Sequence, residues 1–340
     1  MIVKKITTIL MGLMVMAAIF AGCGNGRSKQ EATPTPDVTA APVEMKIGSL
    51  KGPTSMGLVY LMKQSEENKA VNDYDFIMYT AADELLPLIT KGELDIAMVP
   101  ANVASVLYNK TNGAISVIDI NTLGVLYIVS GDESIKSIQD LKGKTIYMTG
   151  KGTVPEYALT YILKSNNLET GKDVTVEFKS EPTEVASILA QDTSAVGLLP
   201  QPFVTSAMMQ NDKLKIVLDL TEQWNNIQGK GGSTLVTGVT IIRNDFLKAN
   251  EAAVKAFLKE YKTSTEYVNT NVAEAAQLVA EKGIVAKAAI AEKAIPYCNI
   301  TYMDGKDMKE ALSGYLQVLF DQNPESVGGK LPADDFYYIP

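Results

Sequence analysis

The chain contains an internal repeat with an offset close to 100 residues, and this repeat is the strongest constraint on its fold. Each copy alternates short apolar runs with amphipathic runs, which is the pattern of β-α units around a mainly parallel sheet. Four landmarks share one register, so chance similarity is a poor explanation. We therefore expect two similar α/β lobes in tandem. The paired landmarks are Lys51-Gly52 with Lys151-Gly152, Glu84 with Glu184, Pro100 with Pro200, and Asp119 with Asp219.

Hydrophobic periodicity predicts the elements of both copies. In the first copy, strands are expected at 45–50, 74–80, 94–99 and 114–120, with helices at 54–67, 83–91 and 102–108. In the second copy, strands are expected at 145–149, 174–179, 195–199 and 214–220, with helices at 154–165, 183–191 and 203–210.

Two extended segments, 121–129 and 234–242, are rich in β-branched residues and are expected to cross between the lobes. The helices expected at 250–269, 272–282, 287–294 and 306–320 would then return to the first lobe. The predicted fold is α/β, with two similar lobes joined by two crossover segments. Lobe 1 would comprise 45–122 plus 238–340, and lobe 2 would comprise 123–237.

The N-terminus has the pattern of an export signal. Lys4 and Lys5 precede an uncharged run whose apolar part is too short for a transmembrane helix, although an N-terminal membrane anchor is the alternative interpretation. The following Phe20-Ala21-Gly22-Cys23 resembles a bacterial lipobox, with Cys23 as the lipid attachment site. We expect a signal peptide at 1–22 and a disordered, lipid-anchored tether at 23–44. Loss of the signal would change the net charge from −8 to −10.

Composition narrows the classes of function. The acidic balance argues against nucleic acid as a partner. The chain has no histidine, which excludes Ser-His-Asp and Cys-His catalysis and the H-E-x-x-H zinc site. With Cys23 lipidated, Cys298 is left without a disulfide partner and is expected to be a small buried residue. We expect no catalytic residue, no metal site and no cofactor.

Ligands of open α/β sheets bind outside the carboxyl ends of the strands, where helices begin. The loops after the first strand of each copy are therefore candidates, because their glycines let a ligand approach the backbone. Thr153 and Glu156 also match a capping box, and the spacing of a P-loop is absent from both loops. The candidates from these loops are Lys51, Gly52, Thr54 and Ser55, and Gly152 and Thr153.

Four further candidates follow the third strands and the crossings. Asn102 and Gln201 stand at the start of helices, where each is either a helix cap or a ligand contact. Asn121 begins the first crossing, and Trp224 is either a core residue or an aromatic wall for a flat ligand. The only arginines are Arg27 and Arg243, so these loops offer no bidentate arginine clamp. A polar, possibly heteroaromatic ligand therefore fits at least as well as a small oxyanion.

Several strings resemble the substrate-binding lipoproteins of ABC importers, in the branch for nitrate, sulfonates, taurine and thiamine precursors. They are Lys51-Gly52-Pro53-Thr54-Ser55-Met56-Gly57-Leu58, Gly92-Glu93-Leu94-Asp95-Ile96-Ala97, Asp140-Leu141-Lys142-Gly143-Lys144 and Gly197-Leu198-Leu199-Pro200-Gln201-Pro202-Phe203. The resemblance implies a type II periplasmic-binding-protein-like fold that closes on one small molecule. It implies a monomer, anchored by lipid outside the cell, that passes a pyrimidine, sulfonate or nitrate-type ligand to ABC permease subunits.

Two alternatives remain open at this stage. A lipoprotein of the same fold could sense its ligand and report to a membrane receptor. Some relatives in this branch synthesise the thiamine pyrimidine, a chemistry associated with an active-site histidine, which this chain lacks.

Overall fold

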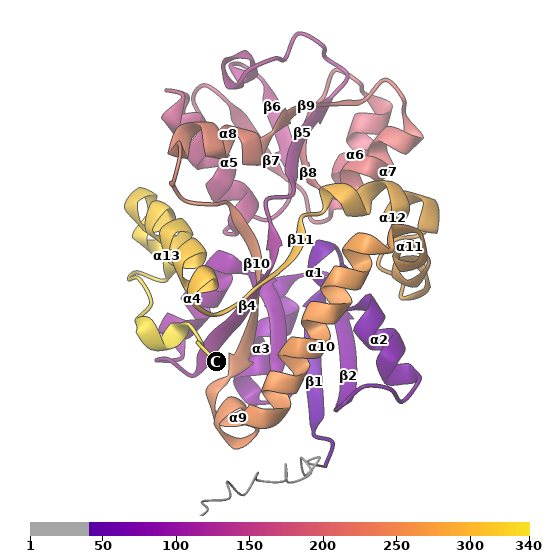
Figure 1. The fold of residues 1–340 in the computed structure, drawn as a ribbon. Helices are drawn as coiled ribbons and strands as arrows, with labels where there is room; N and C mark the ends of the chain where they lie inside the picture. Colours follow the sequence, from indigo (N-terminus) through magenta and orange to yellow (C-terminus); the bar gives the residue numbers. More distant parts are fainter. Residues whose placement is uncertain (1–40) are drawn as a thin grey trace, which may run out of the picture. The chain divides into compact units, whose positions relative to one another are not determined.

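The computed structural model describes residues 41–340, which form two sheets flanked by helices (Figure 1). The predicted signal peptide, Cys23 and most of the predicted tether lie outside the described residues. We call the part built on the six-stranded sheet lobe 1 and the part built on the five-stranded sheet lobe 2. In 41–340, no helix is long and apolar enough to cross a membrane.

The sheet of lobe 1 has the strand order β11-β4-β10-β3-β1-β2. Its strands β1, β2 and β3 are parallel, while β10 runs antiparallel between β3 and β4. The bounds are β1 Glu44–Leu50, β2 Asp73–Tyr79, β3 Ile96–Pro100, β4 Ile115–Leu123, β10 Val236–Arg243 and β11 Ile300–Met303.

The sheet of lobe 2 has the order β7-β6-β8-β5-β9, with β5 antiparallel between β8 and β9. The bounds are β5 Leu126–Ser130, β6 Thr145–Met148, β7 Thr175–Phe178, β8 Val196–Pro200 and β9 Lys215–Asp219.

The strand registers confirm the repeat. Ile47 of β1 pairs with Ile96 of β3, and Ile146 of β6 pairs with Val196 of β8. In the same way, Pro100 pairs with Gly238 and Pro200 pairs with Leu126, so each lobe receives an antiparallel strand at the same place. The fold is thus the expected α/β type II arrangement of two similar lobes.

The two segments predicted to be extended are strands of the two sheets. Within 121–129, β4 of lobe 1 continues to Leu123 and β5 of lobe 2 begins at Leu126, so only two residues lie between them. Strand β5 lies between β8 and β9 of the second sheet. The return segment forms β10, which lies between β3 and β4 of lobe 1.

Helices cover both sheets close to where periodicity predicts them. Their bounds are α1 Pro53–Met56, α2 Val59–Glu66, α3 Ala82–Lys91, α4 Ala101–Lys110, α5 Val154–Ser165, α6 Pro182–Gln191, α7 Phe203–Gln210, α8 Leu220–Gln228, α9 Asn244–Ala249, α10 Glu251–Thr270, α11 Val272–Glu281, α12 Ala288–Ala294 and α13 Gly305–Gln322. Short 3₁₀ turns lie at Ile138–Leu141, Ile295–Tyr297, Pro324–Val327 and Asp334–Phe336.

The helix predicted over 54–67 is interrupted, and close packing explains the break. The Ser264 hydroxyl on α10 donates to the Gly57 carbonyl at 2.6 Å and accepts from the Leu61 amide at 3.0 Å. A Cβ at Gly57 would lie 2.9 Å from the Tyr261 hydroxyl, so only glycine lets α10 approach this closely. The helix therefore ends as α1 and restarts as α2.

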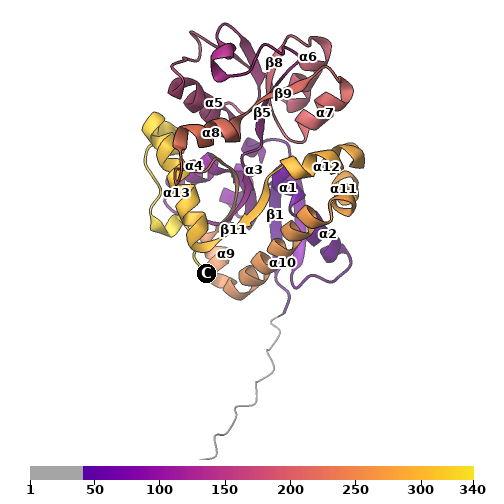
Figure 2. The same cartoon turned by 45° about the horizontal axis from the view of Figure 1, so that its top comes forward.

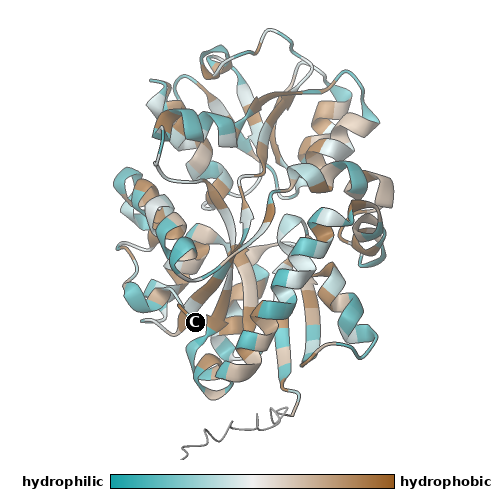
Figure 3. Cartoon of the chain, in the orientation of Figure 1, coloured by the Kyte–Doolittle hydropathy of each residue, from teal (hydrophilic) through white to brown (hydrophobic). Residues whose placement is uncertain are grey.

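The C-terminal helices lie on both sides of the lobe 1 sheet. Helix α10 packs on α2, α13 packs on α4 and β4, and α12 reaches α7 of lobe 2. Helices α12 and α7 are neighbours in both views (Figures 1 and 2). The sheet strands carry the apolar residues, while the outer helix faces carry polar ones (Figure 3). The prediction that Cys298 is a buried residue is confirmed, and burial raises the pKa of its thiol.

An aromatic cluster joins the two lobes. Trp224 on α8 is fully buried, with its ring 4.7 Å from Tyr161 of lobe 2 and 5.5 Å from Tyr315 of α13. Its indole N–H donates to the Ser233 carbonyl at 2.9 Å. One hydrophobic cluster accordingly runs through both lobes and includes Trp224 and Tyr315.

Asp119 is a carboxyl group buried in lobe 1 without a partner. It is 0% exposed, and neither of its oxygens has a hydrogen-bond partner. Burial is the main reason that its pKa is raised to about 8, and the negative charge of Asp304 adds to the shift. Since the usual carboxyl pKa of aspartate is about 3.9, the folded chain binds an extra proton between about pH 4 and pH 8. Stability should therefore fall as the pH rises through this window.

We expect Asp119→Asn to remove most of this pH dependence, because the amide has the same shape and does not ionise. At about pH 5, the variant and the parent should unfold at similar denaturant concentrations. At about pH 9, the variant should have an unfolding free energy higher than that of the parent by about 2–5 kcal/mol. The exposed Asp212→Asn is the control, with no expected change in the profile. If Asp119→Asn changed the unfolding free energy by the same amount at every pH, this account would be contradicted.

Trp224→Ala should cost about 3–5 kcal/mol of unfolding free energy in a denaturant titration, because it leaves a large cavity between the lobes. The control is Tyr297→Ala, whose side chain is 56% exposed and whose change should stay within about 1 kcal/mol. A similarly small loss for Trp224→Ala would show that the tryptophan is not a core residue.

Candidate functional site

Asn102 is the point where the predicted site residues of the two lobes meet. It lies in the first turn of α4, directly after β3, and is 1% exposed. Its Nδ2 donates to the Gly152 carbonyl of lobe 2 at 3.1 Å and to the Ser326 carbonyl of lobe 1 at 3.2 Å. Because both acceptors are carbonyl oxygens, the amide nitrogen must face them. The Oδ1 atom is buried and has no partner.

The start of α4 has no side-chain cap. Its N-cap residue is Pro100, which has no side-chain acceptor, so Asn102 is not the cap that the sequence offered as its alternative role. The first N–H groups of a helix have no partner within the helix, and they carry its partial positive charge. This end of α4 can therefore accept an anionic or polar ligand.

Gly52 stands in the loop after the neighbouring strand β1, as Asn102 stands after β3. Each residue stands two positions after a strand, and β1 and β3 are adjacent and parallel. Gly52 has a φ of 138°, which L side chains rarely adopt, and a Cβ there would meet no atom within 4 Å although the residue is buried. The loop therefore leaves open space against its backbone.

Thr54 and Ser55 hold this loop together. The Thr54 hydroxyl donates to the Leu50 carbonyl at 2.8 Å, and the Ser55 hydroxyl bonds to the same carbonyl at 2.6 Å. Ser55 also lies 2.7 Å from the Ser49 hydroxyl and is fully buried. Both predicted ligand contacts have structural partners, and the structure gives Ser55 no exposed surface.

The corresponding loop of lobe 2 is closed by a different set of bonds from the predicted capping box. The Thr153 hydroxyl donates back to the Gly150 carbonyl at 2.7 Å and does not cap α5. Glu156 accepts instead from the Gly152 amide at 2.5 Å. The capping box is therefore wrong in detail, because the hydroxyl that would cap the helix is used within the loop.

A cavity of about 490 Å³ lies between the lobes and includes one predicted residue, Lys51. This volume is within the range of small-molecule sites. We call it cavity I. Residues after the strand ends and on the following helices line cavity I: Lys51, Thr80, Glu181, Thr183, Phe203 and Ser206. The segment 283–286 of lobe 1 also lines it.

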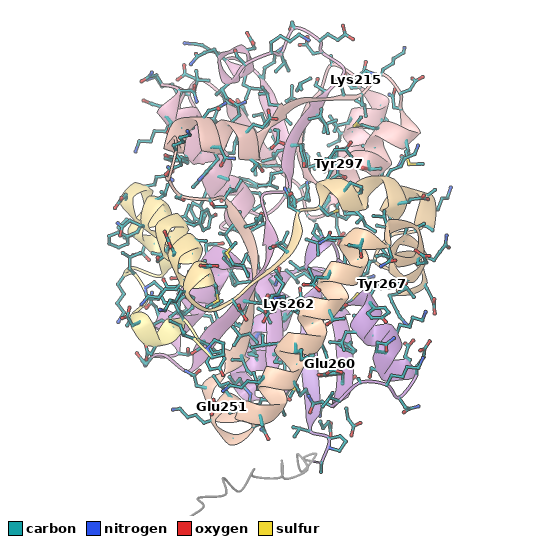
Figure 4. All side chains as sticks on the ribbon, viewed as in Figure 1. Lys215, Glu251, Glu260, Lys262, Tyr267 and Tyr297 are labelled. Carbon is teal, nitrogen blue, oxygen red and sulfur yellow. The ribbon has the colours of Figure 1, made fainter. Side chains whose placement is uncertain are left out.

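A second interlobe cavity of about 640 Å³, cavity II, contains Gln201. Its Oε1 accepts from the Thr205 amide at 3.2 Å and from the Thr205 hydroxyl at 2.8 Å, so Gln201 also serves the first turn of α7. Gln201 thus has the helix-capping contact that the sequence offered as one alternative, and it also lines a cavity. Tyr297, labelled in Figure 4, faces it from the other lobe.

Asn121 and Trp224 are not at an open surface. Asn121 donates to the Thr240 hydroxyl at 3.1 Å and accepts from the Thr122 hydroxyl at 2.9 Å, so it links two strands of lobe 1. Trp224 lies on α8, whose first turn is capped by Asp219. It is a core residue and not an exposed aromatic wall.

Arg243, the arginine within 41–340, lies away from these loops. Arg243 is bonded to Asp95 at 2.9 Å and to Asp245 at 2.8 Å, at the far ends of the strands. Across 41–340, no group of three or more Cys, Asp or Glu side chains could hold a metal ion.

The segment from Tyr297 to Asn299 of lobe 1 is hydrogen-bonded to the first crossing and to lobe 2. The Leu123 amide donates to the Asn299 carbonyl at 3.1 Å, and the Asn299 side chain donates to the Gly124 carbonyl. The Tyr127 hydroxyl of lobe 2 donates to the Tyr297 carbonyl at 3.1 Å. The segment from Tyr297 to Asn299 therefore holds the first crossing and lobe 2 at once.

Sequence reasoning missed the residues after the second strand of each copy. Thr80 follows β2, and Glu181 and Thr183 stand where α6 begins after β7. Strands β2 and β7 are parallel neighbours of β1 and β6, so their carboxyl ends meet the same edge. The repeat contained this signal, because the same argument used for the first and third strands applies to the second.

Comparison with solved structures shows the same fold. An ABC transporter protein from Parabacteroides distasonis is 23% identical, with coverage of 88% of this chain and 99% of that one and a TM-score of 0.73. The periplasmic aliphatic sulphonate-binding protein SsuA from Escherichia coli is 14% identical, with coverage of 88% and 93% and a TM-score of 0.69. A Candida albicans protein described as having the generic periplasmic binding protein fold is 15% identical, with coverage of 87% and 93% and a TM-score of 0.57.

A search of curated proteins gives no match. A family model, described as the periplasmic substrate-binding protein for phosphonate of an ABC transporter, matches residues 65–286, which is more than half of the chain. The resemblance to binding proteins of ABC importers is confirmed. The chain belongs to the family of periplasmic phosphonate substrate-binding proteins of ABC transporters.

Proposed function

We propose that this chain is an extracytoplasmic solute-binding lipoprotein, which holds a small polar molecule between its lobes and delivers it to the membrane permease of an ABC importer. The observation that carries this proposal is the junction at Asn102. There a buried side chain of lobe 1 bonds to the backbone of lobe 2 and keeps one polar atom unpartnered.

Closure of the lobes is the physical basis of capture. Contacts between the lobes are made at Asn102, at the Tyr127 hydroxyl and in the packing of Trp224 on Tyr315. A ligand that touches both lobes adds contacts that exist only in the closed state, so it shifts the equilibrium towards that state. The two cavities between the lobes support this mechanism.

The polar groups at the junction favour a small ligand recognised by hydrogen bonds. The candidate donors are backbone N–H groups at the start of α4, and the charged groups nearby are Glu156, which accepts from the Gly152 amide, and Lys51, which lines cavity I. Pyrimidines related to thiamine precursors, sulfonates, nitrate and phosphonates are all compatible with such a site. No residue at the junction has the arrangement of a catalytic group, and the proposed role is binding without chemistry.

Cys23 would anchor the protein to the outer face of the cell membrane, and the following segment would act as its tether. The acidic mature chain would remain a soluble monomer at the end of this tether, because like charges oppose self-association.

The first test is whether the protein retains or binds a small molecule. Mass spectrometry of solutes released from the natively purified chain should identify a bound compound, and adding it back to the stripped protein should raise the melting temperature. The fluorescence emission of Trp224, the single tryptophan, should change on binding, because its ring packs on Tyr161 of lobe 2 and on Tyr315 of lobe 1. If no solute changes either the melting temperature or the small-angle scattering profile, the proposed capture is wrong.

Cys23→Ala should abolish lipid attachment, because the sulfur atom of Cys23 is the atom to which the lipid would be joined. In cells fed a labelled fatty acid, the parent chain should become labelled and move to the membrane fraction, whereas the variant should do neither. Cys298→Ala is the matched control and should be labelled like the parent. Labelled Cys23→Ala protein would disprove the lipobox.

A further inference from the structure

Gln201 places a buried hydrogen-bond donor at cavity II. The residue is 1% exposed, and its Oε1 accepts from the Thr205 amide at 3.2 Å and from the Thr205 hydroxyl at 2.8 Å. A backbone amide can only donate, so the side chain cannot turn over and place its nitrogen there. The atom left over is Nε2, which donates to no group within 41–340.

The free Nε2 atom is accessible from cavity II. It is not among the polar atoms of the described residues that are both buried and unpartnered, so solvent reaches it. Gln201 lines cavity II and has almost no other exposed surface, so the accessible part of its amide faces this cavity. A ligand in cavity II could accept this hydrogen bond without displacing any protein partner.

The wall of cavity II is largely apolar and comes from both lobes. Met209 of α7 and Ile216 of β9 belong to lobe 2, and Tyr297, labelled in Figure 4, belongs to lobe 1. These three are half of the six large apolar side chains that are exposed within 41–340. Exposed apolar side chains that gather around one cavity favour a ligand with apolar surface, and Tyr297 adds an aromatic face.

The charged side chains at cavity II have opposite signs. They are Glu292 and Lys293, which are adjacent on α12 and exposed to solvent. An ion placed against the apolar wall would lose hydration without gaining a buried partner of opposite charge. Cavity II therefore favours an uncharged ligand.

Cavity I lacks a buried polar group of this kind. Of its polar side chains, all but Ser206 are exposed, and the half-buried Ser206 hydroxyl already accepts from Gln210 at 3.3 Å. A ligand in cavity I would therefore complete no unmade hydrogen bond of a buried side chain. A ligand in cavity II would complete one.

Given the proposed capture of a solute, on which this inference rests, we infer that the solute binds in cavity II. It is an uncharged molecule with an apolar or aromatic body and one strong acceptor, such as a carbonyl oxygen, that faces Gln201 Nε2. Because the wall comes from both lobes, this ligand bridges them in the closed state. Its class differs from the phosphonate named for the matched family.

Benzamide, benzoate and benzylammonium test the charge of the ligand, because the three probes share one ring and differ mainly in charge. The full chain, stripped of any solute, is titrated with each probe at about pH 7, where both ions keep their charge, and binding is followed by NMR of the probe. Benzamide should bind at least about tenfold more tightly than either ion.

Gln201→Glu should reverse this preference. A carboxylate still accepts from both groups of Thr205, so the start of α7 is kept, while the donor at the cavity becomes a negative acceptor. Benzamide should bind at least about tenfold more weakly than to the parent, and benzylammonium should become the tightest of the three probes. Gln210→Glu makes the same change of charge at an exposed position of α7 and should keep the parent order.

Ile216→Ala tests the apolar wall independently of Gln201. It should weaken benzamide binding by about threefold or more, because it removes apolar surface from the cavity. Ile77→Ala on β2 is the matched control, since both isoleucines are 38% exposed and Ile77 lies outside cavity II, and it should leave the affinity unchanged. If Gln201→Glu does not fold, this pair still decides whether benzamide binds in cavity II.

Tighter or equal binding of either ion by the parent, no binding of benzamide, or the parent order of affinities in Gln201→Glu would overturn the inference. An ionic solute released from the natively purified protein, or a released solute that does not displace benzamide, would also overturn it while leaving the proposed capture intact. Absence of any captured solute would instead refute the capture, whereas benzamide binding that Ile216→Ala weakens would still support a binding site in cavity II.

Discussion

The fold depends on the exchange of one antiparallel strand between the lobes. Strand β10 lies between β3 and β4 of lobe 1 but enters from lobe 2, and β5 lies between β8 and β9 of lobe 2 but enters from lobe 1. The sheet of lobe 1 is complete only after the chain has crossed to lobe 2 and returned, whereas the sheet of lobe 2 is complete after the first crossing. Only two residues separate β4 from β5, and there the Asn299 side chain donates to the Gly124 carbonyl.

The repeat preserves the backbone more faithfully than the roles of side chains. Asp119 and Asp219 correspond in the repeat, but Asp119 lies in the middle of β4, whereas Asp219 is the last residue of β9. Asp219 accepts from the amides of Thr221 and Glu222, because α8 begins there. Strand β4 instead continues towards the crossing, so no helix start is available to Asp119 and its carboxyl group stays unpartnered. The same divergence separates Asn102, which bonds across to lobe 2, from Gln201, which bonds to its own helix.

Local pattern was sufficient to predict most of the elements, and helices α5 and α7 have the predicted bounds. The errors have tertiary causes. The break at Gly57 depends on α10, which is about 200 residues away along the chain. Strand β11 pairs only at the edge of β4, and its short run carries a weak signal. Among the candidate site residues, Asn102 and Gly152 are in contact, while their predicted role in ligand binding stays a prediction. The sequence could not separate Lys51 and Gln201, which line different cavities, because both stand at the same sheet edge.

The hydrogen bonds of Asn102 to both lobes couple the orientation of its amide to their closure. Of the two carbonyl oxygens that hold the amide, Ser326 O belongs to lobe 1 and Gly152 O to lobe 2. If the lobes separated, only the Ser326 carbonyl would remain to orient the amide. A ligand that left a polar atom unpaired in the closed state would therefore lose part of the free energy that favours closure.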